Sequence, residues 1–400
     1  MLKIYMVQEE IVMSKFIRNV FILSVVCVSV LTNSSVAHSY TFKAKGYAPT
    51  SDFGNKVESI KLYGDNLSRF NLSSDDFEIE YIDGDNTVKE KVDKIQLGED
   101  YVELHFEAIS YNTNFNITCT KTDDLNISKN DIKFDLGDSD KFKSGIHKAT
   151  EDSEMLQYRL YTPQVTNDEK VPLVLVLHGG GEVGSDNSIQ LTANDMITGF
   201  ASDRIQSKYK SYVLAPQLPA ELKVNVDTTG KIGWNEPKIK QALLDTLNDL
   251  ESEYPCIDKS RIYITGCSMG AMGTWGMITS YPDMFAAAMP VCGQGDISLM
   301  ENIKEMPIWA FHATNDPVVP MYGQKDQYKY NNNIIGTKTI VYRLKELGSN
   351  IKFTEFSEED MLKAGVRVDE NAIYNHFAWV PAYNNEEAID WLFSQRNNKA

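Results

Sequence analysis

The sequence predicts two folded parts, a small all-β sandwich of immunoglobulin type over residues 38–136 and a mostly parallel sheet with helices on both faces over residues 140–400. In the first part, short runs rich in Val, Ile, Phe, Tyr and Thr are separated by turn clusters, as in antiparallel sandwiches. In the second part, apolar runs of strand length alternate with helical patterns, which is typical of a parallel sheet covered on both faces. A chain of 400 residues exceeds what one compact core normally fills, so we expect two domains.

The first part contains a series of predicted strands joined by turns such as Asp-Gly-Asp-Asn at residues 83–86. These strands cover residues 40–45, 57–63, 77–82, 92–97, 101–108 and 115–120. The sequence has no Cys-Trp-Cys framework, so only the architecture of an immunoglobulin domain is predicted, not an antibody-like variant. A polar stretch at residues 130–146 marks the boundary with the second part.

The second part is predicted to open with a strand at residues 155–161, followed by an all-apolar buried strand at residues 171–177. Further strands are predicted at residues 212–215, 262–265, 286–291, 308–312 and 351–356. A helix is predicted over residues 237–254, because Asn235 and Pro237 are start signals and apolar side chains fall on one face. Two more helices are predicted at residues 269–280 and 386–393.

The N-terminus has the pattern of a secretory signal peptide over residues 1–37. Lys15 and Arg18 precede an apolar stretch at residues 20–31 that is too short to span a bilayer, and Ser-Val-Ala at residues 35–37 forms a small-x-small cleavage site. Both Met1 and Met13 are candidate starts. We therefore expect a secreted, extracellular protein that is not held in the membrane after signal cleavage.

The composition limits the classes of partner. The net charge of -17 argues against nucleic acid and anionic membranes, because both would repel an acidic protein. The cysteines beyond the signal have neither CxxC spacing nor a histidine cluster beside them, so no metal site is expected. We expect these four cysteines, at positions 119, 256, 267 and 292, to be mostly reduced and buried.

Residues 266–270, Gly-Cys-Ser-Met-Gly, have the pattern of a nucleophile elbow, a sharp strand-to-helix turn that exposes a serine. A β-branched strand precedes Ser268 and a helical pattern follows it, which is the context that such a turn requires. Glycines at both flanks keep side chains out of the crowded turn. The backbone N–H of Met269, at the start of the helix, is expected to point to where an oxyanion would form.

A second glycine-rich segment, His-Gly-Gly-Gly at residues 178–181, follows the buried strand that ends at Leu177. This is where α/β-hydrolases place the other donor of the oxyanion hole. Glycines leave their backbone amides unshielded and let the loop approach a substrate carbonyl. Three glycines are also compatible with a merely flexible turn, but their place after Leu177 and the preceding histidine favour a functional role. We therefore expect Gly179 or Gly180 to complete an oxyanion hole with Met269.

A serine hydroxyl becomes a good nucleophile when a histidine takes its proton and a carboxylate orients that histidine. In α/β-hydrolases these residues follow one another as Ser, acid and His. Asp316 lies just past a predicted strand and is followed by proline, whereas Asp326 and Asp360 are the alternative acids. His376 is the one histidine downstream of Asp316. The predicted triad is therefore Ser268, Asp316 and His376.

Two further side chains have open roles. Trp234 lies before the helix at residues 237–254 and is a candidate substrate-binding residue of the acyl site, although a packed loop tryptophan is equally consistent with the sequence. His312 ends a predicted strand, and we expect it to be a packed residue rather than a catalytic base.

Together these motifs resemble the secreted esterase and predicted-peptidase branch of the α/β-hydrolases, some members of which carry an N-terminal immunoglobulin-like domain. The resemblance covers about residues 140–395. It rests on the glycine-rich loop, the elbow, Leu-Tyr-Thr-Pro at 160–163, Asn-Asp-Pro-Val-Val-Pro at 315–320 and His-Phe-Ala-Trp at 376–379. It implies hydrolysis of carboxylic esters without a cofactor. Cys267 stands where a larger apolar residue is common, and Ala271 and Met272 replace the usual Gly-aromatic pair, which affects the shape of the pocket.

Three functions are compatible with these residues. The first is a secreted serine esterase that forms an acyl-enzyme on a small-molecule or polysaccharide-linked ester, for example an acetyl or feruloyl ester. The second is a serine peptidase with the same triad. The third is a non-catalytic surface-binding protein, against which the intact set of Ser, Asp, His and glycines argues. The sequence does not predict an oligomeric state.

Overall fold

The structure is a computed structural model that describes residues 42–399, apart from residues 65–66, 68–70, 84–85, 123–124, 167, 224–231, 324–332 and 367–372. The predicted signal peptide therefore lies outside the described residues. From Lys43 onward the chain forms one compact unit. Among the described residues, no helix combines the length and apolar character needed to cross a membrane.

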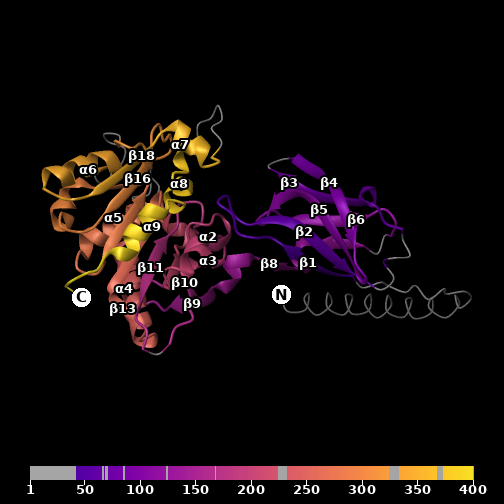
Figure 1. Cartoon of the computed structure of the whole chain (residues 1–400), viewed down its shortest axis with the longest axis horizontal. Coiled ribbons are helices and arrows are strands. Elements are labelled where there is room, and N and C mark those ends of the chain that lie inside the picture. Colours follow the sequence, from indigo (N-terminus) through magenta and orange to yellow (C-terminus); the bar gives the residue numbers. More distant parts are fainter. Residues whose placement is uncertain are drawn as a thin grey trace, which may run out of the picture. The chain divides into compact units, whose positions relative to one another are not determined.

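The N-terminal strands pair in the order β7-β6-β3-β4-β5-β2-β1-β8 (Figure 1). The long strand β4 pairs with β3 through its first half and with β5 through its second half. The rings of Phe115 on β6 and Phe134 on β8 pack edge to face, with 6.5 Å between the ring centres, although their strands lie near opposite ends of this order. The sheet therefore folds over on itself into a layered β structure. The bounds are β1 Lys43–Tyr47, β2 Lys56–Tyr63, β3 Phe77–Asp83, β4 Asn86–Leu97, β5 Tyr101–Ser110, β6 Phe115–Cys119, β7 Asn126–Ser128 and β8 Ile132–Asp135.

The β-rich character predicted for this part is present, but two details differ. The strands β7 and β8 were not predicted, because they are short and lie among Asn, Lys and Asp residues. The pair β1–β8 is parallel, whereas the sequence suggested an antiparallel arrangement throughout. The immunoglobulin-type topology stays a prediction.

The second sheet has the strand order β18-β16-β14-β13-β11-β12-β10-β9. Neighbouring strands pair in parallel from β18 through β16, β14, β13 and β11 to β12. At the other edge, β10 pairs antiparallel with β12 and with β9. The predicted mostly parallel sheet is confirmed. Its bounds are β9 Lys143–His147, β10 Leu156–Tyr161, β11 Val171–Leu177, β12 Tyr212–Gln217, β13 Ile257–Cys267, β14 Ala287–Val291, β16 Trp309–Ala313 and β18 Lys352–Phe356, while β15 Gln294–Asp296 and β17 Ile334–Gly336 pair separately.

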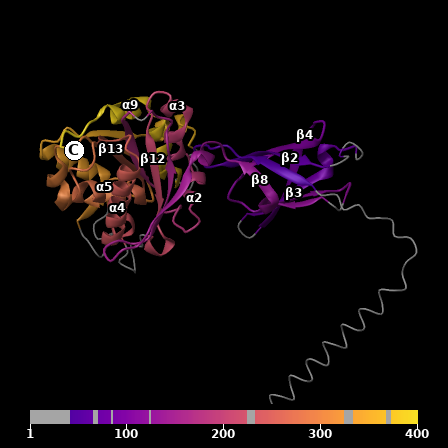
Figure 2. The same cartoon turned by 90° about the horizontal axis from the view of Figure 1, so that it is seen from below.

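Both faces of this sheet are covered by helices, which explains the apolar sequence of β11. Leu173 and Leu175 face a core formed with α4 and α6, while Val174 and Val176 face a core formed with α8 and α9. Figure 2 shows α4 and α5 on one side of the sheet and α3 and α9 on the other. The bounds are α2 Ile189–Thr192, α3 Asp203–Gln206, α4 Pro237–Glu253, α5 Met269–Ser280, α6 Thr337–Glu346, α7 Glu358–Lys363, α8 Trp379–Tyr383 and α9 Glu386–Ser394.

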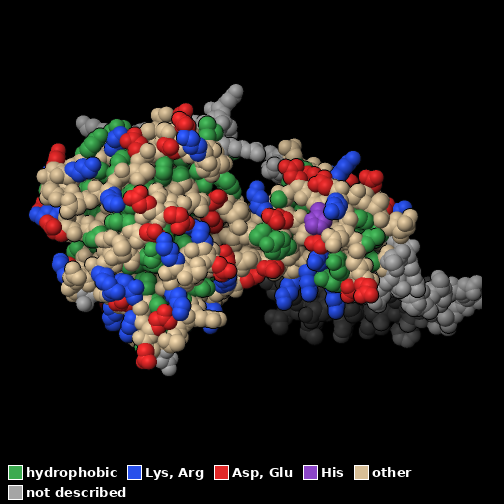
Figure 3. All heavy atoms as spheres, in the orientation of Figure 1, with side chains coloured by type: hydrophobic (Ala, Val, Ile, Leu, Met, Phe, Trp, Pro, Cys, Tyr) green, Lys and Arg blue, Asp and Glu red, His purple; other side chains and the backbone are tan. Residues whose placement is uncertain are grey.

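The stretch predicted as a domain boundary, residues 130–146, contributes to both sheets. It contains β8 of the first sheet and the start of β9 of the second, joined by a 3-10 turn at Gly137–Lys141. Acidic and basic side chains are interspersed on the face shown in Figure 3. The acidic excess is therefore not gathered into one site on that face.

Candidate active site

Ser268 occupies the turn between β13 and α5 with a strained backbone, φ 54° and ψ -119°. The flanking glycines are required by close approach of other backbone atoms. A Cβ on Gly266 would lie 2.5 Å from the carbonyl oxygen of Leu177, and a Cβ on Gly270 would lie 1.9 Å from that same oxygen. The turn therefore has the geometry that a nucleophile elbow requires.

The structure brings the three predicted triad residues together: Ser268 directly follows β13, Asp316 lies just past β16, and His376 comes from the segment between α7 and α8. His376 lies in a 3-10 turn, Ile373–His376, and its Nε2 is 2.9 Å from the hydroxyl of Ser268. Its Nδ1 is 2.7 Å from Oδ2 of Asp316. Because a carboxylate oxygen only accepts hydrogen bonds, Nδ1 carries the proton and donates a hydrogen bond to Asp316. The lone pair of Nε2 then faces the serine O–H, which is the arrangement needed to remove its proton.

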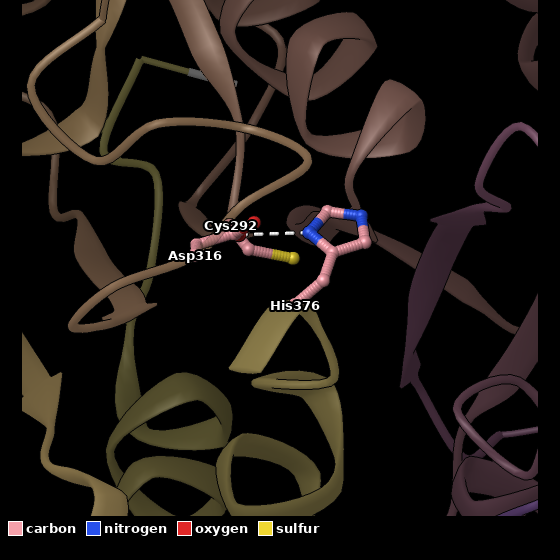
Figure 4. Close-up of side chains that lie close together, drawn as sticks. All are labelled: Cys292, Asp316 and His376. Atoms are coloured by element: carbon pink, nitrogen blue, oxygen red, sulfur yellow. Dashed lines mark hydrogen bonds and ion pairs between the residues drawn. The ribbon is translucent and has the colours of Figure 1, made fainter. Parts of the chain in front are cut away.

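Asp316 follows β16, and its carboxylate is fixed from both sides. Oδ1 accepts the backbone N–H groups of Val318 and Val319, both at 2.9 Å, and Oδ2 accepts the imidazole N–H of His376 (Figure 4). Burial alone would raise the pKa of Asp316. Hydrogen bonds from His312 and His376 outweigh burial and lower that pKa to about 2. The carboxylate is therefore charged at neutral pH.

His178, which precedes the glycines, fixes the loop after β11. Its Nε2 accepts the backbone N–H of Leu218 at 2.9 Å, so its Nδ1 carries the proton and donates to the carbonyl of Gly179 at 2.7 Å. Burial lowers the pKa of His178 to about 4, so the imidazole is neutral. This hydrogen bond ties the carbonyl of Gly179 to the imidazole of His178.

The amides predicted to form an oxyanion hole differ in their surroundings. Within the described part of the chain, the backbone N–H groups of Gly180 and Met269 form no hydrogen bond. The amide of Gly179 lies near the carboxyl of Glu182, whose pKa is raised by burial and lowered to a smaller extent by backbone N–H groups that include this amide. We therefore expect Gly180 to supply the donor of this loop, and its catalytic role stays a prediction.

Trp234 is not among the residues that line the cavity at Ser268, so its surroundings favour the packed-loop alternative over a role in substrate binding. Its indole is fully buried and donates from Nε1 to the carbonyl of His178 at 3.0 Å. Its ring also packs edge to face on the imidazole of His178, with 4.9 Å between the ring centres. Trp234 therefore supports the glycine-rich loop from beneath.

A cavity of about 550 Å³ opens at Ser268 and His376. Its lining is mixed: aromatic and apolar side chains lie near the histidine, and polar side chains lie near the glycine-rich loop. The lining residues other than the triad and the glycines are Asp52, Phe53, Glu182, Ala193, Asn194, Lys223, Cys267, Val318, Phe377 and Trp379. This volume is sufficient for a small-molecule group of moderate size.

Sequence reasoning missed several of these lining residues. Glu182 is the most unusual, because burial raises the pKa of its carboxyl and Oε2 has no hydrogen-bond partner among the described residues. Its place directly after the three glycines was the available signal. Trp379 packs edge to face on His376, with 5.6 Å between the ring centres, and the motif at residues 376–379 did not indicate that contact.

Cys292 places a thiol beside the acid-base pair (Figure 4). Its sulfur and the facing atoms of Asp316 and His376 all lie within 4.8 Å of one another. Burial raises the pKa of the Cys292 thiol well above its ordinary value, and the other two groups are already hydrogen bonded to each other. The group is therefore explained as part of the triad, and the expectation that the protein needs no metal stays a prediction. In the described part of the chain, Cys119, Cys256, Cys267 and Cys292 are buried and form no disulfide.

Comparison with known proteins finds a peptidase family and an esterase structure that are similar to this chain. The prolyl oligopeptidase family matches residues 239–341, a segment that contains Ser268 and Asp316. A thermostable esterase of known structure is 29% identical, with a TM-score of 0.67, over 88% of this chain and 99% of that chain.

Two curated proteins match shorter segments. A poly(3-hydroxyalkanoate) depolymerase C of Paucimonas lemoignei is 32% identical over 133 residues, which is 30% of this chain and 28% of that protein. A bifunctional acetylxylan esterase/xylanase of Neocallimastix patriciarum is 30% identical over 93 residues, which is 23% of this chain and 14% of that protein. The chain thus spans less than a third of either relative. The sheet order and these likenesses together support an α/β-hydrolase fold and show that the chain is similar to esterases and peptidases.

Proposed function

We propose that the protein is a secreted serine esterase that hydrolyses carboxylic esters through an acyl-enzyme on Ser268. The observation that carries this proposal is the continuous hydrogen-bond chain from Asp316 through His376 to Ser268, which ends in an open cavity. Secretion rests on the signal pattern of residues 1–37.

In the first half of the reaction, His376 takes the proton of Ser268 as the serine oxygen attacks the ester carbonyl. The carboxylate of Asp316 stabilises the imidazolium that forms. The amides of Gly180 and Met269 donate to the oxyanion, and each such donor typically contributes about 3 kcal/mol to transition-state stabilisation. His376 then gives its proton to the leaving alcohol oxygen, and the carbon–oxygen bond breaks to leave the acyl group on Ser268.

In the second half, water enters the cavity and gives a proton to Nε2 of His376 while its oxygen attacks the acyl carbon. The bond to Ser268 breaks, the serine regains its proton from His376, and the carboxylic acid leaves. No cofactor takes part in this proposal, because every proton moves between Ser268, His376, water and substrate.

An ester is the favoured substrate because a thermostable esterase is 29% identical over 88% of this chain and 99% of its own length. The similarity to an acetylxylan esterase/xylanase favours acetyl esters on polysaccharides as one natural substrate class. Phe377 and Trp379 line the cavity beside His376, where the leaving alcohol must lie to receive its proton. We expect this aromatic wall to contact the alcohol portion of the substrate.

A fluorophosphonate probe tests the nucleophile. We expect the purified protein to be labelled, Ser268→Ala to lose the label, and Ser280→Ala, at the far end of the same helix, to keep it. Labelling that persists in Ser268→Ala would show that another residue is the nucleophile.

A serine peptidase is the second candidate, favoured by the match to the prolyl oligopeptidase family. Amides have a poorer leaving group than esters, so the two functions separate on matched substrates. We expect kcat/KM for p-nitrophenyl acetate to exceed that for short peptide anilides by several orders of magnitude. Comparable turnover of both would favour the peptidase.

A further inference from the structure

A second histidine, His312, lies against the carboxylate of the triad. It belongs to β16, between β14 and β18, and its side chain is fully buried. Its Nε2 is 2.9 Å from the carbonyl oxygen of Val319 and 3.3 Å from Oδ2 of Asp316. His312 is therefore close to the same carboxylate oxygen that orients His376.

The protonation of His312 follows from its neighbours. Both atoms near Nε2 are acceptors, so Nε2 carries a proton and shares it between the carbonyl of Val319 and the carboxylate of Asp316. The other ring nitrogen, Nδ1, is buried and has no hydrogen-bond partner among the described residues. An unsatisfied buried nitrogen is unfavourable for folding, so a role in filling space alone does not explain a histidine here.

Oδ2 of Asp316 consequently faces two imidazole N–H groups, one from His376 at 2.7 Å and one from His312 at 3.3 Å. We propose that His312 is a positioning residue for the triad, which holds Oδ2 in line with Nδ1 of His376 and draws charge away from that oxygen. The inference rests on the proposed function, because it assumes that Asp316 and His376 act in hydrolysis. Without His312, Oδ2 would lose one of its two imidazole donors, so its orientation would depend on His376 alone and it would interact more strongly with the proton on His376.

Other titratable groups near this pair are accounted for. Cys292, directly after β14, is a buried thiol beside Asp316, and Glu182 lines the same cavity as His376. On β18, Glu355 is opposite His312 in the register, but its carboxylate pairs with Lys338 at 2.6 Å. The N–H of His312 is thus the side-chain donor, besides His376, that lies nearest Oδ2 in the described part of the chain.

The test compares His312→Met with His312→Gln in the full-length protein. The two side chains have nearly the same shape, but the amide of Gln keeps an N–H donor at the end of the chain and Met removes it. Activity is measured against p-nitrophenyl acetate from pH 4 to pH 9, and each rate is divided by the fraction of protein that a fluorophosphonate titrates.

We expect His312→Met to lower kcat by at least about tenfold with KM nearly unchanged, because the donor acts on the triad and not on substrate binding. The acid limb of kcat/KM should move to higher pH by roughly half a unit, because the less neutralised carboxylate of Asp316 favours the protonated form of His376. His312→Gln should restore most of kcat and return the limb to its original place.

Thermal unfolding of all three proteins separates a positioning role from a structural one. The inference is overturned if His312→Met unfolds at lower temperature but keeps the acid limb and the titrated kcat of the original protein, or if Gln fails to restore either quantity. Failure of the proposed function is recognised separately, because the unaltered protein would then neither bind the phosphonate nor hydrolyse the ester.

Discussion

At the scale of single residues, the carboxylate of Asp316 is held ionised in a buried place by the N–H groups directed at it. Its pKa of about 2 lies below the ordinary value of 3.8. A lowered pKa means that the charged carboxylate stabilises the fold at pH values above 3.8, and that this contribution is lost as the pH falls toward 2. Between pH 4 and pH 9 the charge on Asp316 is constant, so pH effects on activity in that range arise elsewhere.

The role of Asp316 is tested by Asp316→Asn. The amide keeps the size of the side chain but cannot hold His376 in the same tautomer, so we expect kcat to fall roughly ten-thousandfold while KM changes little. The measurement is steady-state hydrolysis of p-nitrophenyl acetate.

Asp360→Asn is the matched control, since Asp360 was an alternative acid. Its carboxylate accepts hydrogen bonds from the N–H and O–H of Ser357 at the start of α7. The substitution should therefore destabilise the first turn of α7 and leave kcat unchanged. A large loss of kcat in Asp360→Asn would contradict the assignment of the acid. The other alternative, Asp326, lies outside the described residues.

At the scale of elements, the elbow and the glycine-rich loop are packed together by their backbones. The start of α5 lies against the end of β11, with no room for a side chain between Gly270 and the carbonyls of Leu177 and His178. Because the turn at Ser268 and the glycine-rich loop share this contact, their relative position is set by backbone atoms and not by flexible side chains.

Gly270→Ala tests this contact. A new Cβ would lie 1.9 Å from the oxygen of Leu177, which backbone atoms cannot easily avoid. Overpacking costs about 1–3 kcal/mol, and we expect a loss of stability at the upper end of that range together with loss of esterase activity.

Gly199→Ala is the control for Gly270→Ala, because a Cβ at Gly199 would meet no atom within 4 Å. Unfolding midpoints and activity are measured for both variants. Equal stability of the two variants would show that the close approach at Gly270 is not essential.

At the scale of the whole molecule, the cavity receives residues from the segment that joins β1 to β2. Asp52 and Phe53 line it together with Ser268 and His376. The segment is held by a hydrogen bond from the N–H of Asn55 to the carbonyl of Thr192 at 2.9 Å. We therefore expect this N-terminal segment to influence which substrates enter.

Phe53→Ala tests that influence. The side chain is 44% exposed and lies at the cavity, so its removal should raise KM several-fold for esters of bulky alcohols and leave hydrolysis of methyl acetate nearly unchanged. Ile82→Ala, an exposed position on β3 that does not line the cavity, should change neither. An equal effect on large and small esters would show that Phe53 supports the fold and does not select substrates.

A carboxyl pair in the same region predicts a dependence of stability on pH. Burial, followed by the nearby charge of Asp52, raises the pKa of Asp195 to about 7. A raised pKa in the folded state means that the contribution of Asp195 to stability is fully present below the ordinary value of 3.8 and is lost as the pH rises through about 7. Asp195→Asn should remove this decline, so its unfolding midpoint relative to the original protein should be higher at pH 8 than at pH 5. Asp168→Asn, at an exposed carboxylate, is expected to show no such difference.

Much of the catalytic part could be predicted from local patterns. The strand at Val171–Leu177 has the predicted bounds, because a strand buried on both faces is apolar throughout. The helix at Met269–Ser280 also has the predicted bounds, because the elbow sequence marks where it starts. Helix α6 and strand β9 were missed, since α6 begins without a capping side chain and β9 is mostly exposed and lies in a polar stretch.

The sequence by itself determined the chemical types and the order along the chain: a serine between two glycines, then an acid, then a histidine, with a glycine-rich loop before them. These follow from local backbone requirements, which depend on neighbouring residues. Only the tertiary structure decided that Trp234 donates to the carbonyl of His178, that the amide of Gly179 lies near the carboxyl of Glu182, and that His312 shares the carboxylate of Asp316. Such contacts join residues far apart in the chain, and their distances are fixed by how the strands pack in the sheet and not by any local pattern.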